Sequence, residues 1–296
     1  MLHLIDLHMH SMYSDDGELT PKQLVERCVA GGIRTMSITD HNTVRANEEA
    51  QREAQEAGIH YIPGIEIDCV FLNLNFHVLG YGIDYHADDF YRIEENVNSQ
   101  SRNASIQMLE KTKELGFDIT EEDMQKIAKN NVWMNSWTGE MFAEVLLNQT
   151  RYCNHPLLSP YRAGRTRGDN PYVNFYWDFY SQGKPCYTKI EYPSFEETVE
   201  LIHKNGGKAV LAHPGVNLKD HHELLPSLVD TGIDAVEAFS SYHTPSQASF
   251  FWKEAKEHQL FITCGSDFHG KTKPSISLGQ HGCNLSEKEI ASFLYK

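Results

Sequence analysis

The sequence predicts an α/β fold in which parallel strands alternate with helices. Short apolar runs typical of buried strands recur near both ends of the chain, and a helix-favouring stretch follows most of them. The strand-like runs span residues 2–8, 35–39, 208–212, 233–239 and 260–265. Repeated β–α units of this kind favour parallel strands. A chain of 296 residues leaves room for one barrel with an insertion or for two domains.

Two of the helices are predicted from their start signals. Thr20 is followed by Pro21 and by Gln23, and Ser194 is followed three residues later by Glu197. This spacing is typical of a capping box, in which each end of the motif satisfies a free backbone N–H group of the other. Further helices are predicted at 43–57, 222–230 and 246–258. Residues 60–84 are predicted to be extended segments with a turn at Asn73-Leu74-Asn75.

The middle third of the chain differs from both ends. Strand-like runs vanish after about residue 87, and polar helix-favouring stretches lead into a segment that is first basic and then aromatic. We therefore divide the chain into a first part at 1–86, an inserted, mainly helical lid at 87–186, and a second part at 187–296. Loops at the rim of a barrel commonly control access, so we expect the insertion to cover the site without supplying metal ligands.

Composition limits the partners and the compartment. The chain has 26 lysines and arginines against 41 aspartates and glutamates, a formal charge of -15. Such a surface repels long nucleic acid, although bound cations can still attract a small anion. The six cysteines form no C-x-x-C pair, and no stretch resembles a signal peptide or a membrane span. We expect a cytoplasmic protein with no membrane partner, and the oligomeric state stays open.

Potential metal ligands follow nearly every predicted strand. Asp6, His8 and His10 share parity, so an extended chain points all three to one side. Comparable positions after the other strands hold His41, Glu66, His77, His213, Asp267 and His269. The carboxyl ends of parallel barrel strands converge on one rim, where buried charges need partners. Imidazole and carboxylate without thiolate suit manganese, iron or zinc, and the sequence does not choose among them.

The order of these motifs resembles that of a known family. D-x-H-x-H (6–10), S-D beside a glycine (14–17), T-D-H (39–41), G-x-E (64–66), H-V-L-G (77–80), A-H-P-G (212–215) and G-S-D-F-H (265–269) occur in sequence. They are similar to the motifs of the PHP family of polymerase- and histidinol-phosphatase-like phosphoesterases, everywhere except in the middle third. The resemblance implies a distorted (β/α)7-type PHP barrel with an inserted helical lid.

The resemblance also implies a ligand set for two or three divalent ions. The first ion would take His8, His10, Glu66 and Asp267, the second Glu66, His77 and His213, and the third Asp15, His41 and His269. Glu66 would thus hold a hydroxide that bridges two ions and attacks phosphorus. Asp15 and Asp16 compete for the early position. Asp15 keeps the family's distance from the second histidine, whereas Asp16 precedes the glycine, and we favour Asp15.

Further residues are candidates for supporting roles. Asp6 and Asp40 could orient ligand imidazoles, although simple capping of the strand ends explains them equally well. Lys184 and His243 stand where similar proteins contact substrate, and Arg165, with Arg162 and Arg167, could bind a second phosphate. A surface histidine and a solvated loop are the alternative interpretations. Val216 and Gly139 replace arginines of nucleotide-cleaving relatives, which weakens the case for the same phosphorylated nucleotide.

The function that the resemblance implies is metal-dependent hydrolysis of a phosphate ester in a small molecule. The substrate would be a nucleotide or a sugar phosphate, as a monoester or a cyclic diester. The inserted middle third favours the nucleotide-type subgroup. Histidinol-phosphate phosphatase is a second enzymatic hypothesis. A non-catalytic metal-binding PHP module is a third, but such a module should have lost ligands that this chain retains.

Overall fold

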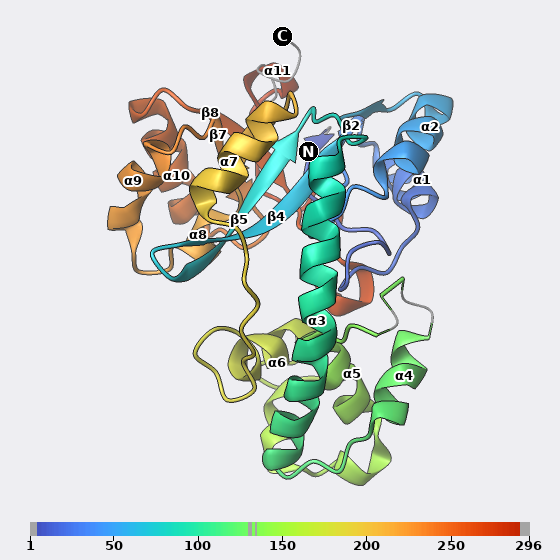
Figure 1. The fold of residues 1–296 in the computed structure, drawn as a ribbon. Coiled ribbons are helices and arrows are strands. Elements are labelled where there is room, and N and C mark those ends of the chain that lie inside the picture. The colour runs from blue at the N-terminus through green and yellow to red at the C-terminus, as the bar shows by residue number, and fades with distance from the viewer. Residues whose placement is uncertain (1–4, 130–131, 134, 291–296) are drawn as a thin grey trace.

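The strands of the protein form two sheets. The structure, a computed structural model, describes residues 5–129, 132–133 and 135–290. The first sheet is parallel, in the order β1-β2-β3, with β1 at Ile5–Asp6, β2 at Thr35–Met36 and β3 at His60–Tyr61. The second has the order β4-β5-β6-β7-β8 and comprises β4 (Gly64–Phe71), β5 (Leu74–Tyr81), β6 (Lys208–Leu211), β7 (Ala235–Ser240) and β8 (Phe261–Gly265). Figure 1 shows both sheets in the upper half of the molecule.

The α/β class is confirmed, but the described strands do not form one closed, all-parallel barrel. β5 pairs antiparallel with both β4 and β6, and only β6, β7 and β8 run parallel to one another in the second sheet. The reason lies in the connection between β4 and β5. It has two residues, Leu72 and Asn73, with φ of 48° and 65°. A two-residue turn with positive φ at both positions joins antiparallel strands.

Backbone hydrogen bonds nevertheless join the edges of the two sheets. Leu7 N–H donates to the carbonyl of Cys264 at 3.1 Å, which brings the chain after β1 beside β8. Asn42 N–H donates to the carbonyl of Glu66 at 2.7 Å, which brings the chain after β2 beside β4. The segments that follow the strands therefore meet on one side of the molecule, as we expected for the ligand-bearing ends.

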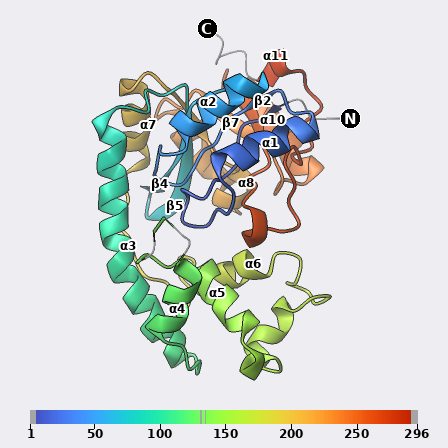
Figure 2. The ribbon, with the colours of Figure 1, turned by 90° about the vertical axis from the view of Figure 1, so that its right-hand side faces the viewer.

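Helices cover the outer faces of the sheets. They are α1 (Pro21–Gly31), α2 (Asn47–Ala57), α7 (Phe195–Lys204), α8 (Pro214–Asn217), α9 (Leu225–Val229), α10 (Pro245–Glu257) and α11 (Glu287–Ile290). Figure 2 shows α1 and α2 side by side over the first sheet. Both predicted capping boxes are present. The side chains of Thr20 and Ser194 accept from the backbone N–H three residues later, and the side chains of Gln23 and Glu197 accept from the backbone N–H of Thr20 and Ser194.

The middle third forms a helical segment of its own. It comprises α3 (Asp88–Glu114), α4 (Glu121–Ala128), α5 (Gly139–Asn148) and α6 (Pro171–Phe179), with short 3-10 turns at Thr150–Tyr152 and Pro156–Tyr161. Figures 1 and 2 show it below the sheets, with α3 reaching from one half to the other. Its apolar core runs from Leu109 to Cys186, but Phe90 of α3 packs into the core of the sheets. The boundaries at 87 and 186 stay a prediction.

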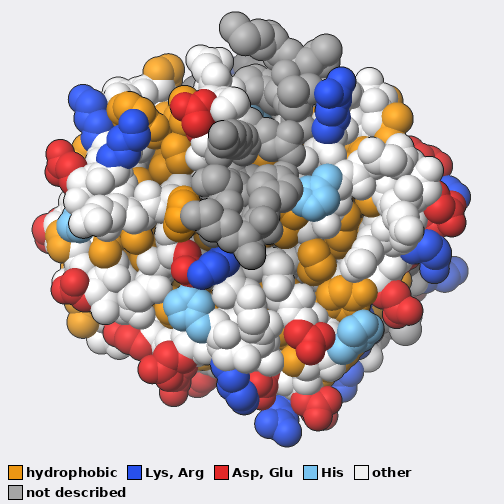
Figure 3. Space-filling model, turned by 90° about the horizontal axis from the view of Figure 1, so that it is seen from above, with side chains coloured by type: hydrophobic (Ala, Val, Ile, Leu, Met, Phe, Trp, Pro, Cys, Tyr) orange, Lys and Arg blue, Asp and Glu red, His pale blue; other side chains and the backbone are white. Residues whose placement is uncertain are grey.

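The face of the molecule seen in Figure 3 lies away from the helical segment. In the view from above, acidic and basic side chains are mixed with scattered hydrophobic and histidine side chains (Figure 3). All six cysteines are free. None of the helices in the described ranges is long and apolar enough to cross a membrane.

Candidate metal centre

Glu66 of β4 lies at the centre of the site and is completely buried. Its Oε2 atom is 3.0 Å from His8 Nε2 and 3.2 Å from His10 Nε2. Asp267 completes this group, with Oδ1 3.2 Å from the same atom of His8 and 3.1 Å from that of His10. These are the four residues that the resemblance assigned to the first ion, and the structure brings their ligand atoms within 4.8 Å of one another.

The other oxygen of Glu66 faces a second pair of imidazoles. Oε1 is 2.9 Å from His77 Nδ1 and 3.0 Å from His213 Nε2. Asp68, two residues along the same strand, lies 3.1 Å from the remaining ring nitrogen of His77. Glu66 thus uses one carboxylate oxygen for each of the two predicted ligand groups, which is the arrangement that a bridging ligand requires.

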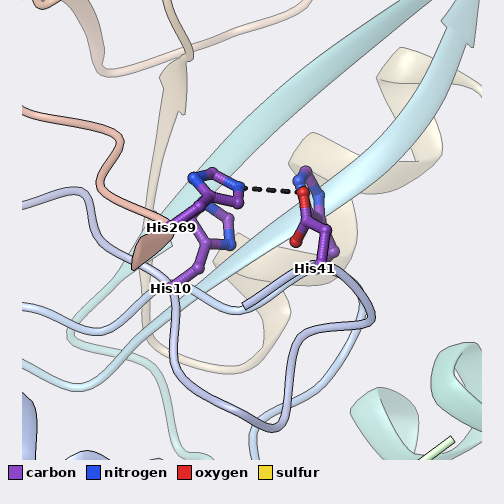
Figure 4. A group of neighbouring side chains, drawn as sticks. His10, His41 and His269 are labelled. Atoms are coloured by element: carbon purple, nitrogen blue, oxygen red, sulfur yellow. Dashed lines mark ion pairs between the residues drawn. The ribbon is translucent and has the colours of Figure 1, made fainter. Parts of the chain in front are cut away.

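The third group contains Asp16 where we had expected Asp15. His10, Asp16, His41 and His269 offer ligand atoms within 4.8 Å of one another, and the rings of the three histidines converge in Figure 4. The ion pair drawn there joins His269 Nε2 to Asp16 Oδ2 at 3.0 Å. Ser14 Oγ–H donates to the other oxygen of Asp16 at 2.8 Å, which turns that carboxylate toward His269.

Asp15 lies beside this group rather than within it. Burial, followed by the charge of Asp16, raises the pKa of the Asp15 carboxyl to about 7. The positive charge of His41 opposes this rise, so Asp15 also lies near one histidine of the group. The structure thus groups Asp16 with the histidines, and the expectation for Asp15 stays a prediction.

The donor atoms suit divalent metal ions. His8 Nδ1–H donates to Glu237 at 3.0 Å, and His269 Nδ1–H donates to the carbonyl of Asp267 at 2.8 Å. With Nδ1 protonated, each ring directs the lone pair of Nε2 toward its ligand group. Metal-binding histidines are commonly oriented by such a hydrogen bond from the other ring nitrogen. His10 Nε2 lies close to two carboxylates without hydrogen-bond geometry. A cation bound between His10 Nε2 and these carboxylate oxygens would accept a lone pair from each of them.

The electrostatics of the site also call for a cation. Burial lowers the pKa of His8, but the charges of Glu66, Glu237 and Asp267 outweigh it and hold that pKa well above its usual range. Burial likewise opposes ionisation of Glu66, yet the surrounding histidines hold its pKa well below its usual range. The carboxylates thus draw positive charge into the site, and metal ions of the predicted kinds would supply it.

Two of the candidate ligands have strained backbone. His213 has φ of 20° and Asp267 has φ of 54°, in the left-handed region that costs non-glycine residues about 1–3 kcal/mol each. Backbone hydrogen bonds hold both in place, since His213 N–H donates to Glu237 Oε2 and Asp267 N–H donates to the carbonyl of His8, each at 2.8 Å. Strain maintained in this way is typical of functional sites.

Glu237 of β7 is a site residue that the sequence patterns missed. It is fully buried, and its two oxygens accept from His8 Nδ1 and from the backbone of His213. Gly265 makes room for this contact, because a Cβ there would collide with His8 and would lie 2.8 Å from Glu237 Oε1. One signal was available, namely a single charge inside the apolar strand A-V-E-A-F, since a buried charge needs a partner.

Comparison with known proteins now decides the family. The family model described as PHP domain matches residues 6–159, more than half of the chain. The chain belongs to the PHP family. The predicted membership is confirmed, and with it the class of enzyme, a metal-dependent phosphoric ester hydrolase.

Relatives of this PHP protein act on several phosphorylated substrates. The 5'-3' exoribonuclease Rnm of Salmonella typhimurium is 30% identical over 94% of this chain and 88% of that protein. A 3',5'-nucleoside bisphosphate phosphatase of Chromobacterium violaceum is 26% identical over 93% of this chain and 90% of that protein. A structure from Bifidobacterium adolescentis, described as a metal-dependent phosphoesterase, has a TM-score of 0.76 at 26% identity and covers 94% of this chain and 91% of that one.

Asp6 and Asp40 bind backbone rather than ligand imidazoles. Asp6 accepts from the N–H groups of Ser266 at 2.9 Å and Gly279 at 2.7 Å. Asp40 accepts from Ser11 N–H at 2.5 Å and from the Ser11 hydroxyl at 2.6 Å. Burial raises the pKa of Asp40 to about 7. Both aspartates therefore fix the loops that carry ligands, which is the capping alternative left open by the sequence.

His243 is also held by backbone groups. Its Nδ1–H donates to the carbonyl of Ala238 at 2.9 Å, and its Nε2 accepts from Gly215 N–H at 3.0 Å. Burial lowers the pKa of this imidazole, so the ring is neutral near pH 7. With both ring nitrogens engaged, His243 braces the A-H-P-G loop, and the substrate contact expected from the sequence would require breaking one of these bonds.

The predicted basic residues lie apart from the ligand groups. Lys184 and Arg165 are exposed, and within the described part of the chain their side chains form no ion pair or hydrogen bond with a candidate ligand. Arg162 donates to the carbonyls of Leu147 and Tyr152, and Arg167 pairs with Asp178 at 3.0 Å. The basic run thus mainly braces the helical segment, because its guanidinium groups satisfy carbonyls and a carboxylate there.

A cavity of about 200 Å³ separates the ligand loops from the helical segment. Its walls include Asp15, Asp16 and Glu18 on one side and Glu140, Met141 and Tyr172 on the other. Nearby, Trp133 Nε1–H donates to the carbonyl of Tyr13 at 2.7 Å. The helical segment therefore lies against the ligand-bearing side of the sheets, where a lid would have to be.

Proposed function

We propose that this PHP protein hydrolyses phosphate esters of a small phosphorylated molecule, a nucleotide or a sugar phosphate. The observation that carries the proposal is the position of Glu66. Each of its oxygens lies 2.9–3.2 Å from a different pair of imidazoles, and the carboxylate is completely buried. Burying a carboxylate among imidazoles is costly, and an apolar side chain of similar volume would often stabilise the fold as well, so a functional role explains Glu66 better.

The ligand set that we propose differs from the sequence prediction at one position. Two or three ions of manganese, iron or zinc would be held by His8, His10, Glu66 and Asp267, by Glu66, His77 and His213, and by Asp16, His41 and His269. Bound divalent ions would lower the pKa of water and neutralise phosphate oxygens. The chain itself contributes the orientation of the imidazoles, which Glu237 and the loop carbonyls fix.

The helical segment would select the substrate. Its residues Glu140 and Tyr172 share a cavity with Asp16, so a group attached to a phosphate at the ligand groups would extend toward them. Enclosure by such a segment excludes water from competing positions and strengthens electrostatic contacts inside the site. This lid role follows from position alone and supports a substrate of nucleotide size.

A 5'-phosphorylated end of a short RNA is a second candidate substrate. The observation that favours it is the 30% identity to a protein named as an exoribonuclease over 94% of this chain. The net charge of -15 opposes tight binding of long RNA, which needs many phosphate contacts to basic side chains. A single terminal phosphate at the ion site would not need such contacts.

A substrate panel tests the proposal. Manganese-loaded protein should hydrolyse at least one member of a panel of mononucleotides, nucleoside bisphosphates, cyclic phosphates, sugar phosphates, histidinol phosphate and 5'-phosphorylated oligoribonucleotides. Chelator-treated protein is the control and should be inactive until metal returns. A clear preference for histidinol phosphate would establish that alternative instead. Full metal content without turnover of any ester would mark a non-catalytic module and refute the proposal.

A further inference from the structure

A lysine that the sequence patterns passed over reaches into the metal centre. Lys273 follows the 3-10 turn Gly270–Thr272 and is only 6% exposed. Its Nζ atom lies 2.7 Å from Asp267 Oδ2 and 3.4 Å from His269 Nε2. Among the lysines and arginines that the structure describes, only Lys273 forms an ion pair with a candidate metal ligand.

The position of Lys273 joins two ligand groups. Asp267 belongs to the group of the first ion through Oδ1, and its other oxygen faces the ammonium. His269 belongs to the group that contains Asp16. An ammonium in contact with both groups lies beside the position of a phosphate that ions in both groups would neutralise.

The side chain of Lys273 is held in this position on two sides. Asp267 fixes the ammonium from one side, and the ring of Tyr242 lies below it, with 5.2 Å between Nζ and the ring centroid. The Tyr242 ring in turn contacts the ring of His213 edge-on at 5.9 Å. Cation–π and ion-pair contacts together restrict a long side chain that would otherwise move freely.

The hydrogen-bonding capacity of the ammonium is not exhausted. A lysine ammonium has three N–H donors. One is directed at Asp267, and the contact with His269 Nε2 is lost when that nitrogen binds a metal ion, as the proposed function requires. At least one donor then remains for an added acceptor. Buried donors are rarely left without an acceptor, and a phosphate oxygen at the metal centre would supply one.

We propose that Lys273 is a substrate-binding residue whose ammonium donates hydrogen bonds to the oxygens of the phosphate held at the metal centre. This inference rests on the proposed function and assigns it a residue outside the metal ligands. It also explains how an acidic site tolerates an anionic substrate, because Lys273 adds positive charge to that of the ions. Its neighbour Lys271 does not share this role, since it pairs with Glu144 of α5 at 2.8 Å on the surface.

Inorganic phosphate is the probe that tests this inference. We would measure its dissociation constant by isothermal titration calorimetry on manganese-loaded protein, and metal content by elemental analysis. Lys273→Met removes the charge at similar length and should weaken phosphate binding by about 10- to 100-fold, the range expected for a lost charged hydrogen bond. Metal content should stay unchanged. Lys271→Met is the matched control from the same loop and should bind phosphate like the wild type.

A second variant covers the case in which Lys273→Met does not fold. Lys273→Gln is also neutral but can donate to Asp267, and the same loss of phosphate affinity is expected. Wild-type phosphate affinity in either variant at full metal content would overturn the inference. A variant that loses metal, but binds phosphate normally once manganese is restored, would show that Lys273 only positions Asp267. Absence of turnover by the wild type on every ester would instead refute the proposed function.

Discussion

Replacing Glu66 by glutamine removes the charge at the centre of the site while keeping its shape. The side chain is completely buried and glutamine has nearly the same volume, so no cavity forms. The loss is electrostatic, because the two oxygens face two ligand groups. If each oxygen contributes one charge-assisted contact of about 1.5–3 kcal/mol, the combined loss is about 3–6 kcal/mol. At 1.4 kcal/mol per factor of ten, this is on the order of 10²–10⁴ in metal affinity.

The assay follows from that magnitude. Protein prepared without chelator would be titrated with manganese by calorimetry and its metal content measured by elemental analysis. We expect Glu66→Gln to lose at least one ion and most of its kcat/KM on the best ester from the panel. The midpoint of thermal unfolding of the metal-free variant should stay within a few degrees of the wild type, because the apolar core does not depend on this carboxylate.

A second buried glutamate provides the control. Glu94 is 7% exposed and pairs with Arg45 at the start of the helical segment, outside the ligand groups. Glu94→Gln should therefore retain metal and turnover, even if it unfolds more easily. Near-normal metal content and turnover in Glu66→Gln would refute the bridging role and with it the reasoning from the two oxygens.

Three further predictions address the parts of the site that the sequence left open. Asp16→Asn should lose metal and most activity while Asp15→Asn keeps its metal, and the reverse result in elemental analysis would restore the family spacing. Glu237→Gln must place an amide NH2 group opposite one of two N–H donors, so metal affinity should fall about 10- to 100-fold in a manganese titration; an unchanged affinity would make Glu237 a core residue only. Gly139→Ala should lower the free energy of unfolding in urea by about 1–3 kcal/mol, because its Cβ would lie 2.8 Å from the rings of Tyr176 and Tyr180; a variant as stable as the wild type would show that these rings move aside.

Local signals in the sequence predicted the elements better than their assembly. The capping box from Thr20 to Gln23 depends only on neighbouring residues, and it is present as predicted. The sequence also predicts a turn at Asn73-Leu74-Asn75, and in the structure a turn at Leu72 and Asn73 joins β4 to β5. The expected parallel barrel did not take account of this turn, which makes β4 and β5 a hairpin within a mixed sheet.

The candidate site shows the same division. The rule that ligands follow strands holds for His213, which comes after β6, but Glu66 and His77 lie within β4 and β5. The sequence offered no ground for preferring Asp16, because the hydrogen bond from Ser14 to Asp16 leaves no pattern in it. Lys273 lies in an irregular loop after the last motif, where neither strand parity nor helical spacing indicates the direction of a side chain.

Helix α3 contributes to two apolar cores, and this limits where the helical segments of two PHP proteins can be exchanged to alter substrate specificity. Its 27 residues rise by about 40 Å at 1.5 Å per residue, with Phe90 rooted among the sheets and Leu109 among the distal helices. An exchange of the segment from residue 87 onward would also replace Phe90 and so disturb the apolar core of the sheets. A graft whose joint falls inside the helix, between these two anchors, would preserve both cores and exchange only the distal half. The part of this architecture that can be exchanged is therefore the distal half of α3 with the helices that pack on it. Because α3 is continuous, the orientation of the exchanged half relative to the site is set by the half that stays.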